Sequence, residues 1–241
     1  MAQMYLCIAM PHRQTECEKF FQMLNVLPVY VAPVLKSCLN IQSMTNDGLV
    51  AKKSEWKRRT PLSAAPKHFE IACALSHLRA CHMFMRSKSN FAFVFEDDNV
   101  VSSSCVERFQ YIASWAKYNY NSFSIINLSP CNSMHTCGYG LLPGTQGCTN
   151  ALLYSRKGAQ FVIENLMPIR SPIDDWLHLN AEDAYCLHKR IFCQHDSVEK
   201  MTLKSFFNPM YRKYERLINA HFICVIGISI FFFSGVVYSL L

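Results

Sequence analysis

Residues 91–100 read FAFVFEDDNV, an apolar run that passes directly into three carboxylates, Glu96, Asp97 and Asp98. The apolar part is typical of a buried strand, and the sudden change to charge marks its end. Like charges this close raise one another's pKa, so the triplet needs a neutralising partner. Side chains alternate along a strand, so Glu96 and Asp98 are predicted to share a face while Asp97 points away. An acid-x-acid pair of this kind suits Mg²⁺ or Mn²⁺, or a ribose, whereas an ordinary acidic turn is the alternative.

Strands and helices alternate on both sides of this run. Before it, the sequence predicts a strand at 4–10, an amphipathic helix at 14–24 and a helix at 67–88. After it, we expect helices at 106–119, 156–168 and 171–189, strands at 122–129, 151–155 and 190–195, and a glycine-rich loop at 130–149. This order indicates an α/β fold with a mostly parallel central sheet. Ligands of such sheets bind outside the carboxyl ends of the strands, where the acidic triplet lies.

Composition and charge narrow the class of protein. The chain has 241 residues, enough for one core or for one core with an appendage, and a net charge of +7. The basic segments 51–60 and 208–217 suit a phosphorylated small molecule or an anionic lipid, or form solvated surfaces. No basic stripe is interleaved with aromatic residues, so nucleic acid is not an expected partner. 

The cysteines indicate free thiols more than a disulfide framework. Most of the twelve stand singly inside apolar runs, which predicts buried thiols in a reducing compartment. Cys131, Cys137 and Cys148 fall in the glycine-rich loop, where they could pair or bind a metal.

The segment 221–241 contains no Asp, Glu, Lys or Arg. As a helix it would rise about 1.5 Å per residue and span roughly 30 Å, the thickness of a bilayer core. We therefore expect a transmembrane anchor, with a buried core helix as the alternative. Arg212, Lys213 and Arg216 should stay in the cytoplasm. The predicted organisation is a catalytic domain at 1–203, expected to be cytoplasmic, a basic juxtamembrane linker at 204–220 and a single-pass anchor at 221–241.

Four short motifs occur in a fixed order around the triplet. They are Glu70-Ile71 with Cys73 and Ser76-His77, then Glu96-Asp97-Asp98, then Ser155 with Gly158-Ala159, and finally Pro172-Ile173-Asp174. This order resembles glycosyltransferase family 25, which includes lipooligosaccharide and collagen galactosyltransferases. The resemblance implies a GT-A-like nucleotide-sugar fold and a metal-assisted, inverting transfer from a UDP-sugar.

The resemblance also assigns roles to residues. Glu96 and Asp98 are predicted to hold Mn²⁺ or Mg²⁺, which stabilises the charge of the diphosphate leaving group. Four residues are predicted to bind or brace the donor: Arg13, Glu70, His77 and Asp97. Asp174 is the predicted base for the acceptor hydroxyl, with Asp175 second, although acids in the first turn of a helix are also favoured as capping residues. A basic residue in 52–59 could add a bond to phosphate.

The function implied is the transfer of a hexose, galactose in the commonest family members, to a glycan, a lipid-linked sugar (glycolipid) or a glycoprotein acceptor. The alternative is a non-catalytic relative that binds a sugar or a partner at the membrane. It is motivated by the first strand, which reads IAMPHR and keeps only Arg13 of the family's Asn-Leu-Asp-Arg-like sequence.

Overall fold

The computed structural model describes residues 2–57, 66–101, 103–130, 140–145, 147–187 and 190–194, without the side chains of 103, 104, 193 and 194. These residues belong to one unit, Met1–His195. Its strands are β1 (Gln3–Ile8), β2 (Val29–Val31), β3 (Phe91–Glu96), β4 (Asn99–Val101), β5 (Ile125–Asn127), β6 (Leu141–Pro143), β7 (Ala151–Ser155), β8 (Ala184–Leu187) and β9 (Phe192–Gln194). Its α-helices are α1 (Gln14–Leu24), α2 (Ile41–Asn46), α3 (His68–Arg86), α4 (Ser103–Asn119), α5 (Arg156–Asn165) and α6 (Ile173–Asn180).

A seven-stranded sheet in the order β2-β1-β3-β7-β5-β8-β6 forms the centre of this unit. The pairs β1–β2, β1–β3 and β5–β8 are parallel, and β7 and β6 run against their neighbours. Five of the seven strands therefore point the same way, which confirms the expected α/β fold with a mostly parallel sheet. Strands β4 and β9 form a separate antiparallel pair.

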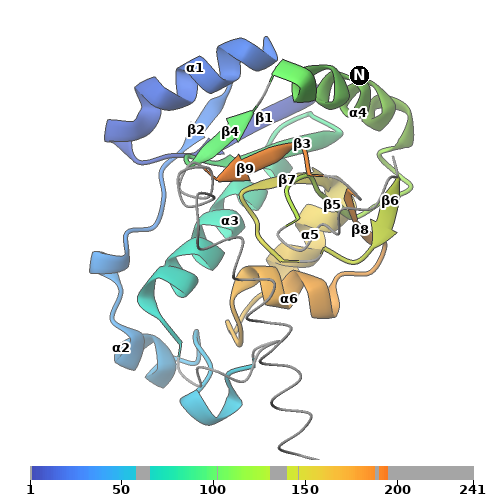
Figure 1. Cartoon of the computed structure of the whole chain (residues 1–241). Helices are drawn as coiled ribbons and strands as arrows, with labels where there is room; N and C mark the ends of the chain where they lie inside the picture. The colour runs from blue at the N-terminus through green and yellow to red at the C-terminus, as the bar shows by residue number, and fades with distance from the viewer. Residues whose placement is uncertain are drawn as a thin grey trace, which may run out of the picture. The chain divides into compact units, whose positions relative to one another are not determined.

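The apolar strand β3 lies inside the sheet and is covered on both faces. Ala92 and Val94 pack in one cluster with residues of α3, α5 and α6. Phe91, Phe93 and Phe95 pack in the other cluster with residues of α1 and α4. Figure 1 shows these two sets of helices on opposite sides of the sheet. Burial of both faces explains why β3 is apolar at every position before Glu96.

The register of the sheet brings several chain segments to one edge. Ile8, the last residue of β1, pairs with Glu96, the last residue of β3. The backbone N–H of Glu96 donates to the carbonyl of Asn150, just before β7, at 2.8 Å. The loops after β1 and β3 therefore meet the loop before β7, as expected for a ligand site at strand ends.

The helix expected at 171–189 is wrong in its second half. Helix α6 ends at Asn180, and Ala184–Leu187 form strand β8. This strand pairs with β5 on one side and β6 on the other, and Ala184, Cys186 and Leu187 are buried. The tertiary partner strands override the helical pattern of the sequence. The loop expected at 130–149 likewise contains β6.

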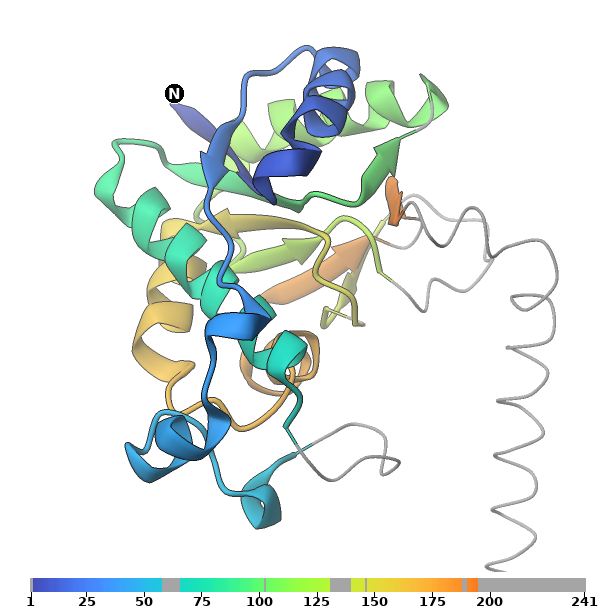
Figure 2. The ribbon, with the colours of Figure 1, turned by 90° about the vertical axis from the view of Figure 1, so that its left-hand side faces the viewer.

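The segment that carries α2 lies beyond the end of the sheet, beside the loop that leads to α6 (Figure 2). Val50 bridges to Ile169, and the N–H of Lys57 donates to the carbonyl of Arg170 at 2.7 Å. These backbone bonds fix the segment to the approach to α6.

No helix among the described residues is long and apolar enough to cross a bilayer. The predicted linker 204–220 and anchor 221–241 lie outside those residues.

Arg156 joins the start of α5 to the end of α3. Its guanidinium donates to the carbonyls of Met85, Ser87 and Ser89 at 2.9, 3.0 and 3.1 Å. It satisfies orphan carbonyls at a helix C-terminus, where positive charge is favoured. We expect Arg156→Met to lower the free energy of unfolding by about 2–3 kcal/mol, because charge-assisted bonds to carbonyls are lost. Urea unfolding followed by circular dichroism measures this change.

The neighbouring Lys157 provides the matched control. Its ammonium pairs with Asp183 at 2.9 Å, and both side chains are about half exposed. Lys157→Met should therefore change the free energy of unfolding by about 0.5 kcal/mol or less. Equal effects of the two substitutions would contradict the assigned role of Arg156.

Candidate active site

A pocket of about 350 Å³ opens at the carboxyl ends of β1 and β3. We call it the strand-end pocket. Its charged lining residues are Arg13, Glu16, Lys19, Glu96, Asp97 and Asp98. The three carboxylates of the triplet thus share one cavity with two cations. The protein compensates the three carboxylates to different extents.

Asp97 is held by the loop after β1. Its carboxylate accepts a hydrogen bond from the backbone N–H of Met10 at 3.0 Å and from Arg13 Nη1 at 3.1 Å. Arg13 also lies 3.5 Å from Glu16. The Asp97–Arg13 pair therefore joins the ends of β1 and β3 and fixes the guanidinium in the pocket wall.

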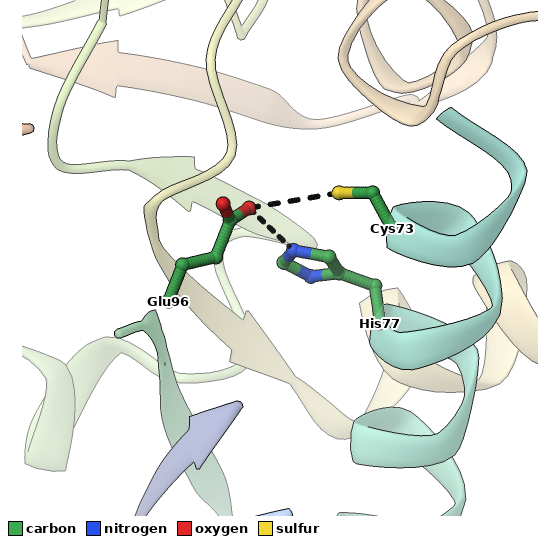
Figure 3. Close-up of side chains that lie close together, drawn as sticks. All are labelled: Cys73, His77 and Glu96. Carbon is green, nitrogen blue, oxygen red and sulfur yellow. Dashed lines mark hydrogen bonds and ion pairs between the residues drawn. The ribbon is translucent and has the colours of Figure 1, made fainter. Parts of the chain in front are cut away.

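Glu96 turns to the opposite side, towards α3 (Figure 3). Its Oε1 atom accepts from Thr149 Oγ1 at 2.8 Å and from Cys73 Sγ at 3.7 Å, and it lies 3.0 Å from His77 Nε2. Burial alone raises the pKa of Glu96, but the bonds from His77, Thr149 and Cys73 outweigh it and leave the pKa below its usual value. Glu96 is therefore an ionised, firmly held carboxylate.

The carboxylate of Asp98 is only partly satisfied by the protein. Its Oδ1 atom is buried and has no hydrogen-bond partner in the part of the chain that the structure describes. Burial, followed by the charges of Glu96 and Asp97, raises its pKa to about 6. A buried carboxylate of this kind is destabilising when ionised unless a cation or a donor approaches it.

A network of hydrogen bonds between buried polar residues continues from Asn99, which lines the strand-end pocket. Asn150 Nδ2 donates to Asn99 Oδ1 at 3.0 Å, and Ser129 Oγ donates to Asn150 Oδ1 at 2.7 Å. Asn99 Nδ2 in turn donates to the carbonyls of Glu96 and Asn150. The turn that carries the triplet is thereby tied to the loop before β7.

Asn127, at the end of β5, holds the next part of that loop. Its Nδ2 atom donates to the carbonyls of Thr145, Gly147 and Cys148 at 2.6–2.8 Å. This clamp presents the Thr149 hydroxyl to Glu96. Sequence reasoning missed Thr149, Asn127 and Asn150. These residues could have been found from the sequence because each is a polar residue at the end of an apolar strand or just before one.

The described cysteines agree with the expectation of mostly free thiols, with pairing left open for Cys148. Seven cysteines of the described residues are free, and four of these are buried. Cys148, in contrast, is disulfide-bonded. Cys131 and Cys137 lie outside the described residues.

Asp174 is the second residue of α6 and, like Asp175, does not line the strand-end pocket. Burial, followed by the charge of Asp175, raises the pKa of Asp174, while the backbone N–H groups of Asp175 and Cys148 lower it in part. Its charge in turn raises the pKa of Cys73, after the larger effects of burial and Glu96. Asp174 therefore lies close to the cluster around Glu96. Both Asp174 and Asp175 occupy the first turn of the helix, as expected.

The structure gives Glu70 a capping contact. Its Oε2 atom accepts from the backbone N–H of Lys67 at 3.1 Å at the start of α3. It lies nearly one turn before Cys73 on that helix. Glu70 is thus placed to brace the helix that supplies Cys73 and His77, and its binding of a donor stays a prediction. Lys52, Lys53 and Lys57 do not line the strand-end pocket, and residues 58 and 59 lie outside the description.

The fold and the pocket define a mixed α/β protein whose strand ends carry both carboxylates and cations. The family model described as glycosyltransferase family 25 (LPS biosynthesis protein) matches residues 39–177, more than half of the chain. The chain therefore belongs to glycosyltransferase family 25, and all four motifs of the sequence fall inside the matched region. Family membership supports glycosyl transfer as the general activity.

Solved structures with a related arrangement are distant in sequence. A197 from STIV matches at 11% identity and a TM-score of 0.42, over 80% of this chain and 83% of that one. S. aureus TarS 1-349 matches at 9% identity and a TM-score of 0.40, over 81% of this chain and 61% of that one. The same protein in complex with UDP-GlcNAc matches at 10% identity and a TM-score of 0.35, over 79% of this chain and 58% of that one. No curated protein matches the sequence.

Proposed function

We propose that this protein is a metal-dependent, inverting glycosyltransferase of GT-A-like fold. It moves a hexose, galactose by analogy with the commonest family members, from a UDP-sugar to a glycan, a lipid-linked sugar or a protein. The observation that carries the proposal is the buried Oδ1 atom of Asp98, which has no partner among the described residues and lies in a pocket that Arg13 also lines. Similarity to a TarS structure in complex with UDP-GlcNAc agrees with a UDP-sugar donor but does not carry the proposal.

The carboxylate oxygens available in the pocket suit a hard divalent cation. Asp98 offers an unsatisfied oxygen, and Glu96 offers its second oxygen, because its contacts with His77, Thr149 and Cys73 all use Oε1. Carboxylate oxygens are the ligands preferred by Mg²⁺ and Mn²⁺. When bound there, the cation would stabilise the charge of the diphosphate leaving group.

Side chains of the protein perform the other proposed steps, which are phosphate binding and proton transfer. Arg13, fixed by Asp97, is placed to donate to a phosphate oxygen from the pocket wall. Asp174 is the proposed general base, with Asp175 second. Its raised pKa makes the carboxylate a better acceptor for the proton of the attacking hydroxyl. His77 braces Glu96, and Glu70 braces the start of α3.

The first experiment measures UDP release by the purified full-length chain. UDP-galactose, UDP-glucose and UDP-N-acetylhexosamines are each incubated with Mn²⁺ or with a chelator, with and without a candidate acceptor. Release that requires Mn²⁺ supports the proposal and names the sugar. Calorimetry with UDP separates the remaining possibilities: binding of UDP without turnover of any donor would favour a non-catalytic family member, and absence of binding would contradict a nucleotide-sugar site.

Asp174→Asn should lower kcat about 100-fold and leave the affinity for UDP unchanged, because general bases contribute about 10²–10⁴-fold to rate. Steady-state kinetics and calorimetry measure the two quantities. Asp183→Asn is the matched control, because Asp183 is an exposed carboxylate that pairs with Lys157 at the surface. Full activity of Asp174→Asn would remove Asp174 from the mechanism and leave Asp175 to be tested.

The membrane anchor at 221–241 and a cytoplasmic catalytic domain also remain proposals, based on the sequence alone. Fractionation of cells that express the full chain and a chain ending at residue 218 tests them. Release of only the shorter chain from the membrane fraction is the expected result.

A further inference from the structure

A second set of metal-binding atoms lies behind the acidic turn, where α3 faces the end of β3. Cys73 and His77 are four residues apart, so they share one face of α3. Cys73 Sγ, His77 Nε2 and a carboxylate oxygen of Glu96 all lie within 4.8 Å of one another. Figure 3 shows the thiol and the imidazole pointing from the helix towards the same oxygen.

A fourth donor completes the group. Thr149 Oγ1 lies 2.8 Å from Glu96 Oε1 and 3.9 Å from Cys73 Sγ. His77 is fully buried, and Thr149 is 7% exposed. The cluster therefore offers one sulfur, one nitrogen and two oxygens in a site from which most water is excluded.

The hydrogen bonds around this cluster are incomplete. His77 Nδ1 and the Tyr154 hydroxyl are buried, and neither has a partner among the residues that the structure describes. Because His77 Nδ1 has no partner among the described residues that fixes its protonation, it can carry the ring proton, which leaves the lone pair of Nε2 for a ligand at the cluster.

We propose that Cys73, His77 and Glu96 form a binding site for zinc, with the Thr149 hydroxyl or a water at the fourth position. Thiolate, imidazole and carboxylate are the ligand types of protein zinc sites, and three protein ligands with one open position are a common arrangement. The oxygen-only environment of Asp98 suits Mg²⁺ or Mn²⁺ instead. The two sites share only Glu96, which can bind through different oxygens.

Binding involves a defined movement of protons. The Cys73 thiol loses its proton to solvent as the sulfur–zinc bond forms, and the proton of His77 resides on Nδ1 so that the lone pair of Nε2 binds the metal. Glu96 Oε1 exchanges its bonds from His77 and Cys73 for a bond to the ion. The bound zinc then links α3 to the last residue of β3. Its role is to hold Glu96 in position.

The test measures metal content of the full chain, purified without chelators and dialysed, by inductively coupled plasma mass spectrometry. We expect about one zinc per chain. Exchange with Co²⁺ should give a thiolate-to-cobalt charge-transfer band in the near ultraviolet. Cys73→Ala and His77→Gln should each lose most of the zinc, and Cys73→Ala should also lose the band. Circular dichroism confirms that each variant is folded.

Two variants separate this site from its surroundings. Cys81→Ala removes another buried thiol two turns further along α3 and should keep the zinc and the cobalt band. Asp98→Asn should keep the zinc while it loses Mn²⁺-dependent UDP release, so failure of the zinc site and failure of the proposed function give different results. A wild-type chain that retains no zinc and shows no cobalt band, or a folded Cys73→Ala variant with unchanged zinc, would overturn the proposal.

Discussion

Replacing Asp98 by asparagine is expected to lower metal-dependent sugar transfer by about 1,000-fold. Removal of one preorganised electrostatic contact to a developing charge typically costs about 10²–10³-fold in rate, and loss of a metal ligand acts on the same charge. The amide keeps the size of the side chain but removes its negative charge. Steady-state UDP release with Mn²⁺ measures the effect, and calorimetric titration of Mn²⁺ in the presence of UDP shows whether the lost step is cation binding.

The same substitution should stabilise the metal-free protein at neutral pH. The pKa of Asp98 is about 6 in the folded protein, against 3.8 for the free side chain, so folding favours its protonated form. This contribution to stability is present in full below about pH 3.8 and is lost as the pH rises through about 6. Asp98→Asn should therefore raise the melting temperature in chelator at about pH 7.5, and the gain should disappear at about pH 4.

Glu164→Gln is the control for both measurements. Glu164 is exposed on α5, bonds to Gln160 within the same helix and does not line the strand-end pocket. It should change neither activity nor the pH dependence of melting. Full activity of Asp98→Asn, or an unchanged melting temperature at neutral pH, would contradict the assigned role of Asp98 as an uncompensated cation ligand.

Gly158→Ala is expected to destabilise the protein by at least about 3 kcal/mol. A Cβ at this position would overlap the carbonyl oxygen of Ser124 and lie 2.6 Å from its carbonyl carbon. Overpacking usually costs about 1–3 kcal/mol, and here the obstacle is backbone. The carbonyl of Ser124 is also fixed, because it accepts from the N–H of Ser155 at 3.0 Å and from its hydroxyl at 3.2 Å.

This expectation runs against helix propensity, since alanine in a helix interior is favoured over glycine by about 1 kcal/mol. Urea unfolding gives the difference in free energy. Gly140→Ala is the control, because a Cβ there meets no atom within 4 Å, and its effect should stay within about 0.5 kcal/mol. A Gly158→Ala variant as stable as the wild type would show that α5 can move away from β5.

The strand β3 shows how far the sequence predicts this fold. Its apolar positions indicate a strand covered on both faces, and the structure places Phe93 and Val94 in separate clusters on opposite sides of the sheet. Successive side chains of an extended strand point to opposite faces, and this alternation is a local property of the backbone. It can therefore be predicted without knowledge of the fold. Strand β8 could not be recognised in this way. Its residues 184–187 follow a helical pattern, and they extend only because β5 and β6 pair with them.

The candidate site was likewise predictable from the sequence only in part. The sequence by itself determined that three carboxylates end a buried strand, that they need neutralisation, and that the surrounding motifs are those of glycosyltransferase family 25. The tertiary structure alone decided how the charge is distributed: Arg13 pairs with Asp97, His77 and Thr149 hydrogen-bond to Glu96, and Asp98 Oδ1 has no partner among the described residues. These partners come from positions 19 to 84 residues away along the chain. Electrostatic pairing depends on distance in space, which sheet register and helix packing set and which local sequence does not encode.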